Sequence, residues 1–207
     1  MEEVAAGLWR WATPHPRWRP EMDRPGGWVR DVGSVAFVSE GNIVLIDPLV
    51  AGDWSELDAV VDSRPVTIVL AAAWHERSSA AIAERYGADV LVHEIGLPRV
   101  KSPTARAMGV GAVAPGVEAL LVGGNDEGEV VLWLPMPRAL VTAEVLTGSA
   151  EGLRVCESPA LRSREALWAW VADLTKLPVE IILPSHGPPV LRNGSEELAA
   201  ALERPPW

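Results

Sequence analysis

The feature that most constrains the fold is a series of short apolar segments separated by helical patterns. Residues 43–47 (Ile-Val-Leu-Ile-Asp) and 66–70 (Val-Thr-Ile-Val-Leu) show little polar alternation. Strands of this kind are expected where both faces of a sheet are buried. Helical patterns at 54–61 and 79–86 separate these strands from each other and from a further strand at 89–93. This succession of strand, helix and strand predicts an α/β protein.

The second half of the chain repeats this plan. Residues 130–134 and 139–142 predict a hairpin, as do residues 35–38 with 43–47 in the first half. Residues 163–176 predict an amphipathic helix, because their apolar side chains recur at helical spacing. A strand at 180–183 and a helix at 196–202 follow. The pattern thus predicts strands and helices in both halves.

Two segments lack such a pattern. Residues 1–31 are rich in proline and tryptophan, and we expect an irregular segment packed on the rest by its tryptophans, with a strand possible at 8–11. Residues 96–116 predict a connection over the surface. Since no stretch has the composition of a linker, residues 1–207 are predicted to form a single domain.

Composition excludes several classes of protein. A net charge of −10 argues against a nucleic-acid partner, whose phosphates require a basic surface. No apolar run reaches the roughly 18–20 residues that cross a membrane, and the acidic start Met-Glu-Glu is unlike a secretory signal, so we expect a cytoplasmic protein without a membrane partner. Cys156 is the only cysteine and is interpreted as a small buried or half-buried apolar residue. The tryptophan-rich start leaves a homodimer open.

The order of these elements resembles the metallo-β-lactamase superfamily, and four segments carry the likeness. They are residues 43–47, 68–83, 139–144 and 182–187, the last reading Ile-Leu-Pro-Ser-His-Gly. The resemblance implies an αββα sandwich, in which two mixed sheets face each other with helices outside. It also implies a site for two metal ions at one edge of the sheets.

The metal ligands that the resemblance implies are mostly replaced. The family motif His-x-His-x-Asp-His matches residues 73–78, Ala-Trp-His-Glu-Arg-Ser, which keep one donor, His75, and carry Arg77 at the aspartate position. Asn125 replaces the middle histidine, beside Asp126, and Glu144 replaces the bridging aspartate. His186 is retained. By analogy His75 and His186 would serve different ions, so sharing a single ion would require the loops to move.

Three functional hypotheses remain open. In the first, the chain has lost the dinuclear centre, binds no cofactor, and uses the remaining cleft to bind a small molecule or a partner, with Trp74, Asn125 and Asp126 as candidate contacts. In the second, His75, Glu144 and His186 hold a single zinc, iron or manganese ion in a hydrolase of ester-like or thioester-like bonds. In the third, Glu144 or Asp126 acts as a base without metal, and Arg77 stabilises an oxyanion.

Three further residues have simpler interpretations. Arg77 is predicted to form an ion pair with Glu144 that replaces the missing metal charge. Asp47 is predicted to hold loops together by hydrogen bonds. His93, at the end of a strand, is predicted to be structural.

Overall fold

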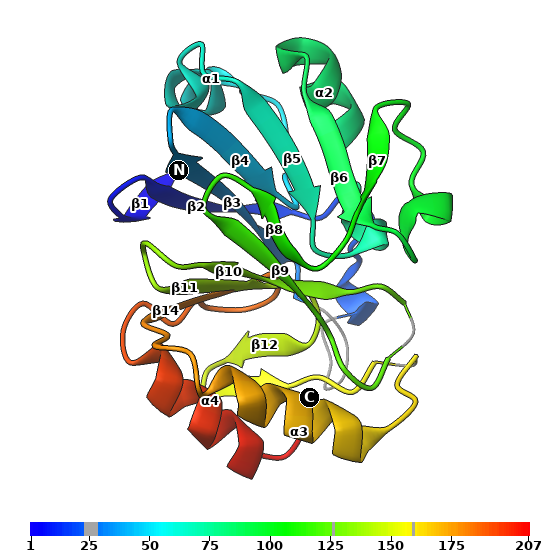
Figure 1. Cartoon of the computed structure of the whole chain (residues 1–207), viewed down its shortest axis with the longest axis vertical. Helices are drawn as coiled ribbons and strands as arrows, with labels where there is room; N and C mark the ends of the chain where they lie inside the picture. The colour runs from blue at the N-terminus through cyan, green and yellow to red at the C-terminus, as the bar shows by residue number, and fades with distance from the viewer. Residues whose placement is uncertain (23–28, 126, 159) are drawn as a thin grey trace.

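The computed structural model describes residues 1–22, 29–125, 127–158 and 160–207. Two sheets face each other in the middle of the molecule, and helices cover their outer faces (Figure 1). This arrangement confirms the αββα sandwich expected from the sequence. No helix in the described part of the chain is long and apolar enough to span a membrane.

The first sheet has seven strands in sequence order. They are β1 (Glu2–Ala5), β2 (Leu8–Pro14), β3 (Asp31–Ser39), β4 (Asn42–Ile46), β5 (Val66–Leu70), β6 (Asp89–His93) and β7 (Ala105–Met108). Neighbours from β1 to β4 are antiparallel, whereas β4 to β7 run parallel. Helices α1 (Ser55–Val61) and α2 (Ser79–Tyr86) cover its outer face (Figure 1).

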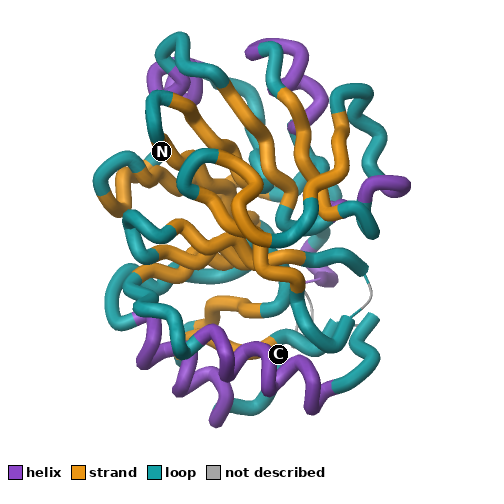
Figure 2. Tube along the Cα trace, in the orientation of Figure 1, coloured by secondary structure: helices purple, strands orange, loops and turns teal. Residues whose placement is uncertain are grey.

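The second sheet has five strands in the order β14-β11-β10-β9-β8. They are β8 (Gly111–Ala114), β9 (Val117–Leu121), β10 (Val130–Leu134), β11 (Ala139–Thr142) and β14 (Ile181–Pro184). A separate hairpin of β12 (Leu146–Ser149) and β13 (Gly152–Val155) lies between this sheet and helices α3 (Arg164–Leu174) and α4 (Gly194–Glu203), as the trace in Figure 2 also shows. Short 3-10 helices occur at η1 (Pro20–Met22), η2 (Ala73–His75) and η3 (Leu97–Arg99).

Strand β4 shows why the apolar segments lack polar alternation. Its Val44 and Ile46 pack between the two sheets, whereas Ile43 and Leu45 pack against the helices outside. Strand β10 divides its residues in the same way between the central core and the core beneath α3 and α4. Each of these strands buries both faces, as the sequence predicts.

The prediction for residues 1–31 is wrong in part and that for residues 96–116 is wrong. The strand allowed at 8–11 lies within β2, but β1, β7 and β8 were not predicted. Residues 1–31 contribute strands β1 and β2, and β2 pairs with β3 from Leu8 opposite Phe37 to Pro14 opposite Asp31. Residues 96–116 contain β7 and β8, and Gly111 at φ 83° begins β8 in a conformation that favours glycine. In both segments, pairing with a neighbouring strand supplies the order that local sequence does not encode. The β12–β13 hairpin was not predicted either.

One contact between the sheets bears on the site. The amide nitrogen of Gly33 in β3 donates to the carbonyl oxygen of Ser185, at a distance of 2.8 Å. A Cβ atom at Gly33 would lie only 2.8 Å from the carbonyl oxygen of Pro184 at the end of β14. Only glycine therefore allows β3 and β14 to approach this closely.

Candidate metal centre

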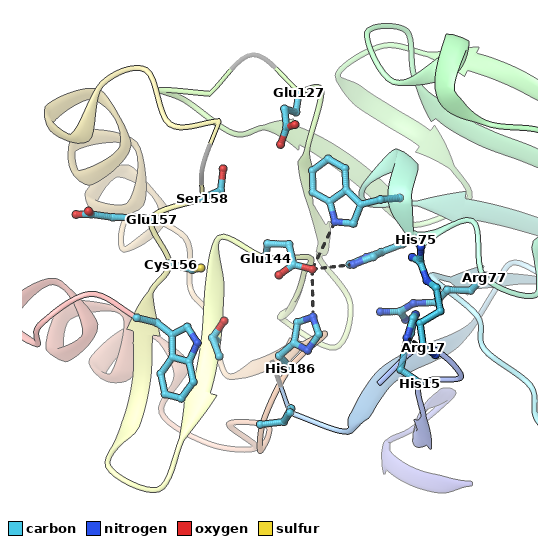
Figure 3. Close-up of a pocket in the computed structure, with 14 residues that line it drawn as sticks. His15, Arg17, His75, Arg77, Glu127, Glu144, Cys156, Glu157, Ser158 and His186 are labelled. Carbon is cyan, nitrogen blue, oxygen red and sulfur yellow. Dashed lines mark hydrogen bonds and ion pairs between the residues drawn. The ribbon is translucent and has the colours of Figure 1, made fainter. Parts of the chain in front are cut away.

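The candidate site lies where loops from both sheets meet. Asp47 follows β4, His75 ends the 3-10 helix after β5, Glu144 follows β11, and His186 follows β14. These loops border a cavity of about 500 Å³ (Figure 3). A cavity of this size is in the range that small-molecule ligands occupy.

Three potential metal ligands converge at the cavity. One donor atom each from His75, Glu144 and His186 lies within 4.8 Å of the other two. The Nε2 atoms of His75 and His186 lie 3.0 and 3.1 Å from the same carboxylate oxygen, Oε1 of Glu144 (Figure 3). From the sequence, we expected that loops would have to move before these residues could share an ion, but the structure already brings them together.

Asp47 orients the first of these histidines. Its Oδ2 lies 2.8 Å from His75 Nδ1, and its Oδ1 accepts a hydrogen bond from the backbone nitrogen of Ala71, also at 2.8 Å. The Asp47 residue is only 2 % exposed, so both contacts are shielded from water. A carboxylate in this position favours the tautomer with a proton on Nδ1 and leaves Nε2 as a lone-pair donor directed at the cavity. The prediction that Asp47 holds loops together by hydrogen bonds is consistent with these contacts.

The three converging side chains place donor lone pairs around the Glu144 carboxylate, and this arrangement requires positive charge. If His75 carries its single proton on Nδ1, its Nε2 lone pair faces the Glu144 carboxylate, and two acceptors at 3.0 Å repel each other. Burial and Arg77 lower the pKa of His75, but Asp47 and Glu144 outweigh them and raise it overall. Burial raises the pKa of Glu144, but hydrogen bonds from His186 and His75 bring it well below its usual range. A proton on His75 or a bound cation would satisfy the cluster.

Glu129 is a second buried carboxylate, and the sequence analysis did not identify it. Its Oε1 accepts hydrogen bonds from the backbone nitrogens of Glu144 and Val145, each at 2.7 Å, and its Oε2 accepts one from Asn125 at 3.2 Å. The residue is 1 % exposed, and burial is the main reason that its pKa is raised to about 7. Glu129 therefore positions the backbone that carries Glu144. Its one signal in the sequence is a charged residue directly before an apolar strand.

Arg77 does not form the ion pair predicted for it. No nitrogen of Arg77 lies within 4.0 Å of a Glu144 oxygen, the limit for an ion pair here. Instead, its Nη1 donates to the carbonyl oxygens of Gly33 and Asp47, both at 2.7 Å, and Nη2 lies 3.5 Å from Ser185 Oγ. Backbone carbonyls satisfy the guanidinium at this depth, and its burial lowers the pKa of Arg77.

The backbone at the site is strained. Arg77 has a φ of 42° and Asp47 a φ of 47°, values in the left-handed region that residues other than glycine seldom adopt. Backbone strain of this kind clusters at functional sites, where the surrounding structure holds it in place. Asp47 contacts the ring of His75, and Arg77 follows His75 by two residues and donates to the carbonyl oxygen of Asp47.

The remaining candidates are distributed around the cavity. Trp74 lines it, and its Nε1 lies 3.4 Å from Glu144 Oε1. Asn125 is outside the lining residues and donates to Glu129, while Asp126 lies outside the described residues. Cys156 lines the cavity, and burial raises the pKa of its thiol to about 12, so the thiol is a poor nucleophile at neutral pH.

Two other histidines differ in position. His93 is buried, and its Nδ1 accepts a hydrogen bond from the backbone nitrogen of Ile95 at 3.4 Å, in keeping with the structural role expected of it. His15 lines the cavity. Neither belongs to the group of three converging donors.

The donor set fits one divalent ion. Two imidazoles and one carboxylate are the protein ligands of several catalytic zinc sites, which leave a fourth position open. Asp47 supplies the hydrogen bond to the outer ring nitrogen that metal-bound histidines usually make. Among the described residues, His75, Glu144 and His186 are the one group of three such donors close enough to share an ion.

Comparison with solved structures finds the same fold over nearly the whole chain. A metallo-β-lactamase from Pontibacter korlensis has a TM-score of 0.72 and 15 % identity, with 99 % of this chain and 98 % of that chain covered. A metallo-β-lactamase family protein from Thermus thermophilus has a TM-score of 0.66 and 17 % identity, with coverage of 97 % and 81 %. A third structure, solved in a di-iron-bound form, has a TM-score of 0.59 and 22 % identity, with coverage of 80 % and 91 %.

No protein-family model matches the sequence, and no curated protein matches it. At the identities of the solved structures, the likeness concerns the fold rather than the reaction. The chain has the metallo-β-lactamase fold.

Proposed function

We propose that this protein is a hydrolase that depends on a single metal ion and acts on an ester-like or thioester-like bond of a small molecule. The ion would be held by His75, Glu144 and His186. The observation that carries the proposal is the convergence of these three donors within 4.8 Å at the wall of a cavity. That a structure of the same fold was solved in a di-iron-bound form supports the capacity of this fold to hold metal.

When bound, a divalent ion at this place supplies Lewis acidity, which polarises an acyl oxygen and makes water acidic enough to react near neutral pH. The residues of the chain prepare the site for it. Asp47 keeps a proton on Nδ1 of His75, so that Nε2 is free to bind. Glu129 holds the backbone nitrogen of Glu144 and thereby the position of its carboxylate. Trp74 lines the cavity beside that carboxylate, and its Nε1 donates to Oε1 of Glu144 at 3.4 Å.

One specific observation favours a second candidate, a site that binds a small molecule without metal or catalysis. Glu144 Oε1 already lies within hydrogen-bonding distance of Trp74, His75 and His186. If both histidines carry a proton on Nε2, each donates a hydrogen bond to Glu144 Oε1, and the carboxylate needs no ion. The two candidates therefore differ in whether metal or protons satisfy Glu144.

Metal analysis separates them. Protein purified without chelator should contain about one equivalent of zinc, iron or manganese, as expected for one set of three donors. His186→Ala should lose that metal, whereas His15→Ala, which changes a cavity histidine outside the donor set, should keep it. EDTA should lower the melting temperature of the wild type, because a bound ion stabilises the folded state.

An activity screen completes the test. Small esters and thioesters should be hydrolysed with added zinc or manganese, and Glu144→Ala should abolish the reaction. Absence of metal together with unchanged melting in EDTA would favour the metal-free binding site. Hydrolysis that persists in EDTA would instead support catalysis by the protein's own acids and bases.

A further inference from the structure

One wall of the cavity carries positive charge although the chain as a whole carries −10. Arg17, Arg77 and His15 lie together on the side of the cavity opposite Cys156 and Glu157 (Figure 3). The same three residues, with Trp74, also line an adjoining cavity of about 430 Å³. We call Arg17, Arg77 and His15 the cationic wall.

The two arginines of the cationic wall lack carboxylate partners. Within the described residues, neither Arg17 nor Arg77 has a carboxylate oxygen within 4.0 Å. Other arginines of the chain do, at distances of 2.7 Å for Arg85 with Asp58 and 2.9 Å for Arg204 with Glu197. In an acidic protein, an arginine charge without an acid beside it attracts an anionic ligand to a cavity, even where one of its nitrogens, Nη1 of Arg77, already donates to the carbonyl oxygens of Gly33 and Asp47.

The pKa of His15 is consistent with positive charge at the cationic wall. Its pKa is lowered, first by burial and then by the charges of Arg17 and Arg77, with smaller contributions from His186 and His75. A nearby carboxylate would act in the opposite direction. The ligand that fits such a potential is an anion.

On the opposite side of the cavity, the charged groups are paired. Glu127 and Glu157 line it together with the uncharged Ser158, but Glu127 pairs with Arg99 at 3.5 Å and Glu157 pairs with Arg164 at 2.8 Å. Figure 3 places these residues on the far side of Glu144 from Arg17 and Arg77. The arginines without an acid partner therefore lie on one side of the cavity only, and an anionic end of a ligand is favoured at the cationic wall.

We propose that Arg77 and Arg17 bind a carboxylate or phosphate group of the substrate and thereby place the bond to be cleaved at His75, Glu144 and His186. The binding of the anion is independent of catalysis, while the placement of the bond rests on the proposed hydrolase function. Guanidinium suits both acid groups, because its planar set of donors can hold two oxygens at once. Arg17 would supply that planar set, while Arg77, whose Nη1 donates to Gly33 and Asp47, would contribute its charge and Nη2.

Binding of three matched probes tests this proposal. Phenylacetate, benzylphosphonate and phenylacetamide share a benzyl group and differ in carrying a carboxylate, a phosphonate or a neutral amide. Affinities are measured by NMR titration with the protein treated with EDTA and again with zinc added. At least one anionic probe should bind about tenfold or more tightly than the amide, as expected for hydrogen bonds to charged groups. The preference should persist in EDTA, because it does not depend on an ion.

Three variants assign the preference to residues. Arg17→Gln should reduce it about threefold to tenfold, and Arg77→Gln should abolish most of it. Arg77→Lys, which keeps the charge, should retain part of it and also controls for loss of the contacts to Gly33 and Asp47. Arg19→Gln removes an exposed arginine on the same segment that lines neither cavity, and it should have no effect.

The outcomes separate the two proposals. Equal affinity for all three probes in EDTA, or a preference that survives in both Arg17→Gln and a folded Arg77→Gln, would overturn the anion site. An intact preference in a protein that holds no metal and hydrolyses nothing would uphold the anion site and refute the hydrolase. The stronger of the two anionic probes identifies the acid group that the substrate carries.

Discussion

The two sheets each use a buried carboxylate to position one proposed metal ligand, but they use it differently. On the seven-stranded sheet, Asp47 contacts the ring of His75 itself. On the five-stranded side, Glu129 contacts the backbone of Glu144 and Val145 and leaves the side chain of Glu144 untouched. The first carboxylate sets which ring nitrogen carries a proton. The second sets where the ligand residue lies.

This difference predicts different consequences of mutation. Loss of the Asp47 contact should change the chemistry of His75 while the fold keeps its shape. Loss of the Glu129 contacts should leave two buried backbone donors without an acceptor and so act first on stability. Variants on the two sides therefore test whether Asp47 and Glu129 act in different ways.

The largest effect is expected where both sides meet, at Glu144. Glu144→Ala removes the carboxylate that both histidines contact, and two imidazoles alone should bind zinc at least about 100-fold more weakly than the full set of three. Isothermal titration with zinc measures this loss. Glu127→Ala, a change of another glutamate lining the cavity, serves as the control. Comparable zinc affinity in the two variants would contradict the assignment of Glu144 as a ligand.

Asp47→Asn should weaken zinc binding by about 10-fold to 100-fold, the usual range for a residue that supports a ligand. If the amide oxygen keeps the contact to Ala71, the amide NH₂ faces His75 Nδ1 and favours a proton on Nε2, where the metal should bind. Titration combined with NMR of the histidine ring nitrogens would detect the tautomer. An unchanged His75 tautomer with unchanged affinity would remove the role assigned to Asp47. Asp58→Asn, at a surface pair with Arg85, is the matched control.

Glu129→Ala should lower the free energy of unfolding by about 2–4 kcal/mol, because it strands two buried amide donors. Glu129→Gln keeps an oxygen acceptor and should cost much less, and its zinc affinity should fall only a few-fold. Chemical denaturation of both variants, without metal, provides the measurement. Equal losses in the two variants would show that the charge of Glu129, rather than its hydrogen bonds, matters.

The smallest effect concerns Cys156, whose backbone nitrogen donates to the carbonyl oxygen of Val145 at 2.9 Å. Because burial raises the pKa of its thiol to about 12, alkylation by iodoacetamide at pH 8 should be much slower than for an exposed cysteine. Glu129→Ala should speed the alkylation by loosening Val145, whereas Asp47→Asn should not. Mass spectrometry follows the reaction. Equal acceleration in both variants would indicate that the two sides of the site do not act separately.

The sequence predicted the regular elements well where both faces of a strand are buried. The bounds of β5, α2, β6, β10 and β11 agree with the predictions, because apolar patterning and the glycine after α2 are local signals. The strand allowed at 8–11 proved to be part of β2, but β1, β7 and β8 were missed, because their order comes from pairing with neighbouring strands rather than from a local pattern. Trp9 and Trp11 face partners in β3 that lie more than twenty residues away.

The site was predictable in part. The resemblance identified His75, Glu144 and His186, but it assigned the histidines to two ions and did not foresee that one carboxylate oxygen lies between them. Arg77 was expected to pair with Glu144, since the sequence shows charges but not the carbonyl oxygens that surround the guanidinium. Glu129 was not identified for a related reason, because its partners are the backbone amides of Glu144 and Val145 after β11.

The close approach at Gly33 ties the two halves of the ligand set to one another. Val32 next to it forms a bridge with His186, and the carbonyl oxygen of Gly33 accepts from Arg77. His75 and His186 come from different sheets, so the distance between them depends on how closely β3 and β14 approach each other at Gly33. A methyl group at position 33 would push β3 and β14 apart and shift the imidazole of His186 away from that of His75. Metal binding by a Gly33→Ala variant would then report how closely the two sheets dock.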